Sequence, residues 1–192
     1  SRRLRWAAAA AALLAAGAAA ALLVPRATGP SPEMVLAEVA EGTLLEHPGE
    51  PPAAARPGTP LFPGDVVRGG GAVVWKGERT RLALSEDAEL ALREAKRCVL
   101  RRGALEAEVA PQAPGRPLAV ATPHAEVRVI GTRFAVAVEP GRTRVDVREG
   151  RVEVQGAKAG TAVEVTAGRR AVASAESAPV VMSLRELYEK RF

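Results

Sequence analysis

The sequence predicts an all-β domain behind one N-terminal transmembrane helix, and three observations support this class. Residues 6–24 are almost entirely apolar and carry no charge. Most of the later chain consists of short runs in which valine or leucine alternates with polar residues, as in half-buried strands. Glycine recurs between these runs at intervals of roughly ten residues, which is typical of a sandwich, a barrel or a coil-like stack of strands.

The apolar segment 6–24 is long enough to cross a membrane. A helix of about 19 residues just spans a hydrocarbon core, so the segment is predicted to be a single-pass helix in contact with membrane lipid. Arg2, Arg3 and Arg5 precede it, and the positive-inside rule therefore places the N-terminus in the cytoplasm. Trp6 would then lie at the inner interface. A cleaved signal peptide is the competing interpretation, because the alanine-rich segment offers many small-residue cleavage sites.

The length of 192 residues allows one ordinary domain and an appendage. The predicted order is a basic cytoplasmic segment 1–5, the transmembrane helix 6–24, a linker 25–33, a β domain 34–175 and a short C-terminal helix 183–192. The charge bias around the transmembrane helix places the β domain outside the cytoplasm.

The composition is basic, with a formal net charge of +5 and an isoelectric point near 10.1. Arginine supplies most of this charge, and it alternates with valine in the predicted strands, so it is expected on their solvent face. Such a surface can attract anionic lipid, polysaccharide or an acidic protein. Nucleic acid is not an expected partner, because aromatic residues make up only 3% of the chain and no basic cluster interleaves with them.

Glycine and proline divide residues 127–154 into valine-rich runs. The parity of the apolar positions changes at each break, so the chain has to reverse or bulge there to keep its valines on a buried face. Gly131-Thr132 allows either a turn or a bulge. Pro140-Gly141 allows a hairpin.

A second two-residue hairpin is predicted at Glu149-Gly150, where glycine would take the positive φ that the turn needs. The expected opposite pairs are Val147 with Val152 and Val145 with Val154 in this hairpin, and Val138 with Thr143 and Val136 with Val145 in the hairpin at Pro140-Gly141.

The same alternation predicts strands elsewhere in the domain. They fall at 35–39, 72–74, 82–84, 90–92, 98–100, 105–109, 162–165 and 171–173. Arg102-Gly103 is expected to form a turn between two of them. Residues 47–63 are rich in proline, alanine and glycine, and they predict an irregular, flexible loop.

The predicted C-terminal helix begins with a capping box. Residues 183–186 read Ser-Leu-Arg-Glu, so the serine can satisfy a helix-start amide while the glutamate reaches back. Leu184, Leu187 and Tyr188 would share one face of the helix. This face can either pack on the domain or dock a partner, and the sequence leaves both open.

No arrangement of residues suggests catalysis, a metal site or a cofactor. Cys98 is the only cysteine, so it cannot form an internal disulfide and is expected to be a small core residue. His47 and His124 are the only histidines, and neither has a nucleophile or paired carboxylate at a suitable spacing. The sequence therefore predicts a protein that is not an enzyme, whose function depends on its surfaces.

An ordered set of residues across 122–154 resembles the signature of the FecR domain, a module of bacterial envelope proteins that relay surface signals across the inner membrane. The matching positions are Thr122, Pro123, Val127, Val129, Gly131, Thr132, Phe134, Val145, Val147, Glu149, Gly150, Val152 and Val154. A similar Leu-x-x-Gly-Asp step stands at 61–65, and the resemblance extends over about 35–174. We take seven of these positions as the structural motif: Thr122, Pro123, Gly131, Thr132, Phe134, Glu149 and Gly150.

The resemblance implies a twisted, solenoid-like or sandwich-like β domain held in the periplasm by a bacterial inner-membrane anchor. It also implies non-catalytic binding of an envelope protein or ligand during transmembrane signalling, as in anti-sigma regulators. The alternative is a structural or carbohydrate-binding protein of the cell envelope that is released by signal-peptide cleavage. In that case the arginine face would meet an anionic polymer.

Overall fold

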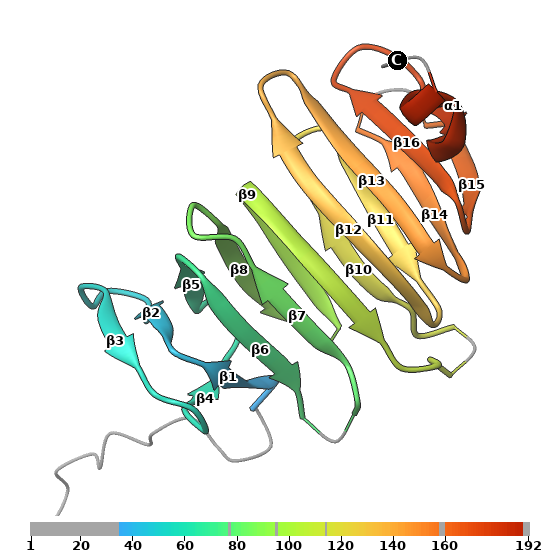
Figure 1. The fold of residues 1–192 in the computed structure, drawn as a ribbon. Coiled ribbons are helices and arrows are strands. Elements are labelled where there is room, and N and C mark those ends of the chain that lie inside the picture. The colour runs from blue at the N-terminus through green and yellow to red at the C-terminus, as the bar shows by residue number, and fades with distance from the viewer. Residues whose placement is uncertain (1–34, 77, 95, 114, 158–159, 190–192) are drawn as a thin grey trace, which may run out of the picture. The chain divides into compact units, whose positions relative to one another are not determined.

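The computed structural model describes residues 35–189, except residues 77, 95, 114, 158 and 159. Strands make up nearly all of this part, which confirms the all-β prediction for it, and the helix α1 (Leu184–Glu189) follows the last strand (Figure 1). None of the helical structure in the described residues is long and apolar enough to span a membrane. The predicted transmembrane segment and its topology residues, Arg2, Arg3, Arg5 and Trp6, lie outside the described residues.

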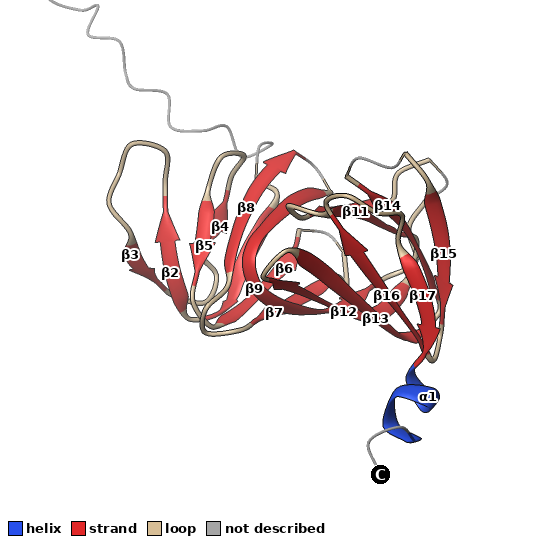
Figure 2. Cartoon of the chain, turned by 90° about the horizontal axis from the view of Figure 1, so that it is seen from above, coloured by secondary structure: helices blue, strands red, loops and turns tan. Residues whose placement is uncertain are grey.

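Hydrogen bonds join the strands into one 17-stranded sheet that folds over into two layers sharing β9 (Figure 2). The front layer, nearer the viewer in Figure 1, contains in spatial order β4 (Pro60–Leu61), β1 (Ala37–Glu41), β6 (Gly71–Trp75), β7 (Arg81–Leu84), β9 (Arg97–Val109), β12 (Thr132–Glu139), β13 (Arg142–Glu149), β16 (Arg169–Ser174) and β17 (Val180–Ser183). The back layer contains β3 (Ala53–Ala55), β2 (Thr43–Glu46), β5 (Val66–Arg68), β8 (Glu89–Glu94), β9, β10 (Leu118–Ala121), β11 (Ala125–Val129), β14 (Arg151–Gly156) and β15 (Ala162–Thr166).

The long strand β9 joins the two layers because it bends at Gly103. Its first half pairs with β8 and β10 in the back layer, and its second half pairs with β7 and β12 in the front layer. Gly103 has a φ of 76°, and a Cβ there would lie 2.5 Å from the Cα of Ala88. The predicted turn at Arg102-Gly103 is therefore wrong, since the glycine bends one continuous strand and does not reverse the chain.

In the C-terminal half the chain passes between the layers at glycine corners. Gly131 separates β11 in the back layer from β12 in the front layer, and Gly150 separates β13 from β14. Both glycines have positive φ, 142° and 77°. The break at Gly131-Thr132, for which the sequence allowed a turn or a bulge, is thus a corner between two layers.

The predicted hairpin at Glu149-Gly150 is wrong for the same reason. Val147 pairs with Phe134 in the front layer, whereas Val152 pairs with Val129 in the back layer. Both valine side chains are buried in the core, but they reach it from opposite layers. The alternation that suggested a hairpin is satisfied equally well by a corner, and the positive φ at Gly150 is confirmed.

The other predicted hairpin is confirmed. The turn at Pro140-Gly141 connects β12 and β13 within the front layer, with Val138 opposite Thr143 and Val136 opposite Val145. The inward side chains of both layers form one core, in which Phe134 is among the largest fully buried residues. Cys98 is also buried in this core, as its type predicted.

The segment 47–63 departs from the prediction, because it contains the short strands β3 and β4 and is not wholly irregular. Each pairs with a single neighbour, β3 with β2 and β4 with β1. Pro60 is tolerated in β4 because a strand at the rim of a layer does not need every amide to donate. The sequence also did not predict β17, which adds a strand to the front layer.

Candidate interaction surface

Four of the seven motif residues meet at one corner of the domain. Gly131 and Thr132 come from the start of β12, and Glu149 and Gly150 from the end of β13. Together with Arg79 and Pro111, among others, they line an open hollow of about 360 Å³. The Thr132 hydroxyl donates a 2.7 Å hydrogen bond to the backbone carbonyl of Arg151 and so ties the start of the front strand to the strand that follows the corner.

Thr122 and Pro123 do not reach this corner, because they lie at the other end of β11, in the turn that precedes it. The Thr122 hydroxyl accepts a hydrogen bond from the amide of Ala125 at 2.9 Å and lies 2.8 Å from the hydroxyl of Thr143. His124 Nδ1 lies 3.2 Å from the same Thr143 oxygen. Since Thr143 is fully buried at the start of β13, this cluster ties the back-layer turn to the front layer.

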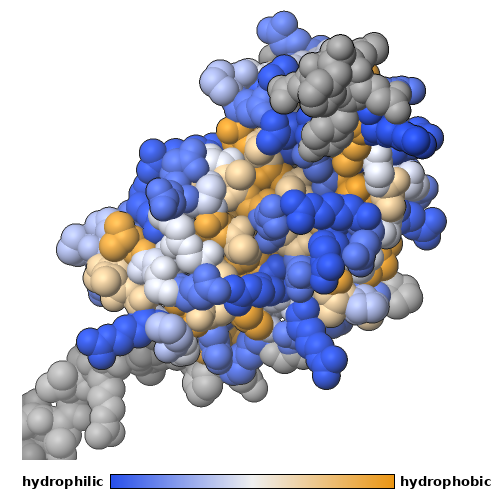
Figure 3. All heavy atoms as spheres, viewed as in Figure 1, coloured by the Kyte–Doolittle hydropathy of each residue, from blue (hydrophilic) through white to orange (hydrophobic). Residues whose placement is uncertain are grey.

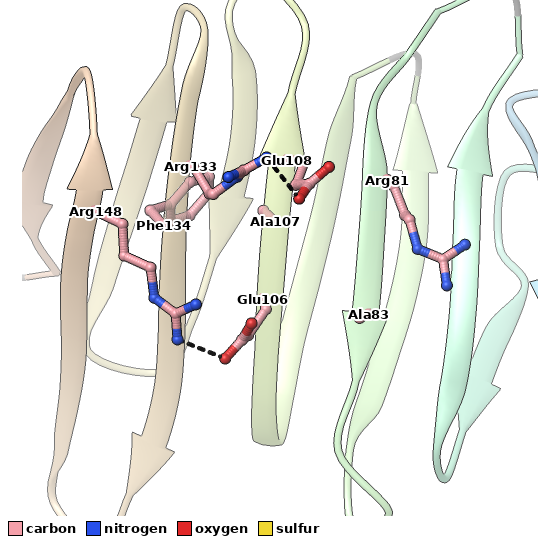
Figure 4. A pocket seen from close by; sticks show the side chains of 8 residues that line it. All are labelled: Arg81, Ala83, Glu106, Ala107, Glu108, Arg133, Phe134 and Arg148. Atoms are coloured by element: carbon pink, nitrogen blue, oxygen red, sulfur yellow. Dashed lines mark hydrogen bonds and ion pairs between the residues drawn. The ribbon is translucent and has the colours of Figure 1, made fainter.

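Phe134 is the remaining motif residue, and its side chain is only 1% exposed. It lies beneath a shallow charged hollow on the outer face of the front layer (Figure 4). We call this hollow the front trough; it has a volume of about 260 Å³. Its lining residues are Arg81, Ala83, Glu106, Ala107, Glu108, Arg133, Phe134 and Arg148. Ala83 on β7 faces outward beside Glu106 and leaves space between the long charged side chains, whereas Ala107 on β9 is 1% exposed and faces the core.

The charged side chains of the front trough come from neighbouring strands and alternate in sign. Arg81 on β7 lies opposite Glu108 on β9, and Glu108 lies opposite Arg133 on β12. Arg133 forms ion pairs of 3.0 Å with Glu108 and 3.3 Å with Glu149. Opposite charges on directly facing residues stabilise a sheet, because their Cβ atoms are about 5 Å apart.

A second ion pair crosses the trough one step further along the strands. Arg148 Nη2 lies 2.9 Å from Glu106 Oε1, and Figure 4 shows the two side chains pointing toward each other. Arg81 is paired with Glu41 on its other side. These arginines do lie on the solvent face, as predicted, but they are matched by carboxylates, so the front trough is a polar ladder and not a free cationic face. Figure 3 shows this face, on which hydrophobic surface appears between the charged side chains.

A denser cluster of the same kind lies on the back layer around Glu89. Its carboxylate is 2.5 Å from Arg68, 2.7 Å from Arg101 and 3.4 Å from Arg102. The hydrogen bond from Arg101 lowers the pKa of Glu89, partial burial opposes this, and the nearby charges of Arg68 and Arg101 lower the pKa further. Glu89 therefore stays ionised at a lower pH than an ordinary glutamate does.

The cysteine and the histidine His47, which could in principle carry chemistry, have contacts that point to structural roles. Burial raises the pKa of the Cys98 thiol to about 12, so the sulfur is neutral and shielded. His47 Nδ1 lies 2.8 Å from the carboxylate of Asp65, which is itself only 1% exposed and accepts the amide of Phe62. Within the described part of the chain, no three His, Cys, Asp or Glu side chains come together as metal ligands would.

The geometry defines an all-β module that is built around glycine corners and carries ion-paired outer faces. Residues 65–153 match the family model described as FecR protein. The resemblance stated from the sequence is thereby confirmed. The matched segment includes all seven motif residues.

Two solved structures resemble parts of this chain. No curated protein matches the chain significantly. Two crystal structures of a "putative anti-sigma factor" from Parabacteroides distasonis ATCC 8503 are similar to it, with identities of 17% and 16% and a TM-score of 0.40 each. The matches cover 76% and 78% of this chain but only 57% and 58% of theirs, so it spans less than two thirds of their length.

Sequence reasoning identified the motif residues but missed the ion-pair ladder. Arg81, Glu108 and Arg133 belong to strands that are distant in sequence, so their pairing depends on a register that is set by the fold. The available signal was the alternation of glutamate with alanine in 104–108 and of arginine with valine in 142–148. That alternation placed the charges outside without indicating which of them face each other.

Proposed function

We propose that this chain is a regulatory sensor of the bacterial envelope that acts by binding, without catalysis, in transmembrane signalling. The observation that carries the proposal is the match of residues 65–153 to the FecR family model. In the proposed arrangement, residues 6–24 anchor the chain in the inner membrane, and the β domain faces the periplasm and binds a protein or ligand there.

The surface of the domain supports a binding role. The front trough spans four adjacent strands and presents charges that are already matched to one another, so it offers a rigid pattern of alternating sign. Such a pattern favours selection of a complementary partner over strong attraction of any polyanion, because mismatched charges are penalised. This property fits protein recognition better than the carbohydrate-binding alternative.

Site-specific photo-cross-linking tests the binding surface directly. Ala135 lies on β12 opposite Glu106 of the trough, and Ala162 lies on the back layer in β15, where it is exposed. A photoreactive phenylalanine at position 135 of the full chain should yield a discrete cross-linked protein in the native membranes, and the same probe at position 162 should not. Equal products at both positions, or none at 135, would argue against the front trough as the binding surface.

The anchor is tested by fractionation and protease access. A tag at the C-terminus of the full chain should remain with the membranes and become accessible to protease only when the outer compartment is opened. Recovery of a shorter, soluble exported form would instead support the alternative, a cleaved and released envelope protein.

A further inference from the structure

The last strand of the front layer leaves an apolar hollow at the C-terminal end of the domain. Val180 on β17 is 57% exposed, which is unusual for a valine in a strand. With Val172 and Met182 it forms the floor of a hollow of about 530 Å³, and Leu187 of α1 stands at its side. Figure 2 shows α1 projecting from the end of this layer.

The register places arginines directly beside this floor. Val180 lies opposite Val172, which in turn lies opposite Arg144 of β13. Met182 lies opposite Arg170 of β16. Because neighbouring strands are about 4.8 Å apart, the arginine side chains reach the edge of the apolar floor.

Two arginines of the rim, Arg142 and Arg144, share one carboxylate. Glu139 Oε2 and Oε1 accept from Arg142 at 2.7 Å and from Arg144 at 2.6 Å. Arg170 donates to Asp146 at 2.8 Å. Arg142 and Arg144 thus share Glu139, and Arg142 remains 59% exposed, so this part of the rim keeps a positive charge.

The volume and the chemistry together indicate what can bind. A hollow of this size accommodates a few side chains but not a folded domain. Its apolar floor favours an aliphatic or aromatic group, and its basic rim favours a carboxylate next to that group.

We propose that the C-terminal hollow, lined by Val172, Val180, Met182 and Leu187 and rimmed by Arg142, Arg144 and Arg170, binds an acidic peptide segment of a partner protein whose apolar side chains alternate with carboxylates. The proposal goes beyond the proposed function, because it adds a binding site outside the front trough and gives the chemistry of its ligand. Its test measures peptide binding alone, so it can fail while the regulatory role stands.

The test is fluorescence polarisation with the full chain and three labelled octapeptides, which alternate leucine with glutamate, leucine with lysine, and serine with glutamate. The leucine-glutamate peptide should bind, and each of the other two should bind at least about tenfold more weakly, since each lacks one of the two required features. The affinity should also fall as salt is raised, because part of it is electrostatic.

Matched variants locate the site. Val180→Asp and Arg144→Gln should each weaken binding of the leucine-glutamate peptide by about tenfold or more. The controls are Ile130→Asp and Arg128→Gln on the back layer, because Ile130 is 58% exposed and Arg128 is an exposed, ion-paired arginine. Neither control should change the affinity.

Three results would overturn the proposal. Equal binding of the leucine-lysine peptide would show that the rim charge plays no part. Equal loss of affinity in the controls would show that binding occurs elsewhere. Binding of phosphatidylglycerol vesicles that is abolished by Val180→Asp, with no peptide binding, would assign the hollow to anionic lipid instead.

Discussion

The Cβ position of Gly150 would lie 2.8 Å from the carbonyl oxygen of Gly131, so the two corners of the FecR motif stack directly on each other. The close approach explains why position 150 suits glycine, since a side chain there would meet backbone that cannot easily move. The motif residues at this corner therefore specify how the chain passes between the layers.

Gly150→Ala should destabilise the domain by roughly 2–4 kcal/mol. The substitution carries the cost of a side chain at a φ of 77° and, in addition, the clash with the Gly131 carbonyl. The control is Gly141→Ala, because Gly141 has a φ of 73° and nothing within 4 Å of its Cβ position. Chemical unfolding should show a clearly smaller loss for Gly141→Ala. Equal losses would mean that the stacking of the corners adds nothing.

Thr143→Val should lower the free energy of unfolding by about 1–2 kcal/mol. The substitution keeps the shape of a fully buried side chain but removes the oxygen that lies 2.8 Å from Thr122 and 3.2 Å from His124. Thr166→Val, at an exposed position of β15, is the control and should be nearly neutral. If thermal unfolding gives equal midpoints for both variants, the hydrogen bonds of this cluster do not contribute to the stability of the fold.

Glu89→Gln should cost roughly 1–2 kcal/mol at neutral pH and less in acid. The pKa of Glu89 is lower in the folded state than its ordinary value of 4.5, so its ion pairs stabilise the fold above that pH and lose their effect as pH falls through the folded pKa. The difference between wild type and variant should therefore shrink below about pH 4.5. The control is Glu164→Gln, since Glu164 is 60% exposed and 3.7 Å from its arginine. A difference that stays constant with pH would contradict this role of the ionised carboxylate.

Cys98 should be unreactive toward thiol reagents in the folded protein at pH 8. Burial raises its pKa to about 12, and the thiolate is the reactive form. Reaction with a disulfide reagent should reach one equivalent only after denaturation. Stability should also decline as pH rises above about 9, because the unfolded thiol ionises there while the folded one stays neutral. Rapid labelling of the native protein would show that the core around Cys98 opens readily.

The sequence predicted strands and their inward faces well, but it did not predict which breaks are hairpins. Pro140-Gly141 and Glu149-Gly150 have the same local signal, a glycine between two alternating runs. At the first the chain stays in the front layer, and at the second it crosses to pair with β11. The difference depends on which strand each segment pairs with, and the neighbouring residues in the sequence do not specify that partner.

The same limit applies to the interaction surfaces. The capping box correctly predicted the start of α1, and alternation placed the arginines outside. The front trough and the C-terminal hollow both depend on cross-strand register, as between Arg81 and Glu108 or between Val172 and Val180. The strand β17 completes the hollow. It has only four residues, and alternation alone did not distinguish so short a segment from a loop.

We propose above all that the domain regulates by contact through its front face. The most direct measurement compares transcript levels in the native organism after deletion of the gene and after its restoration. The gene is restored as the wild type, as Arg133→Glu in the front trough, or as Arg128→Glu on the back layer. Each protein must be present in the membrane in equal amount. We expect deletion to change a defined set of transcripts. The wild type and Arg128→Glu should restore them, and Arg133→Glu should not. Unchanged transcripts on deletion, or full restoration by Arg133→Glu, would contradict this proposal.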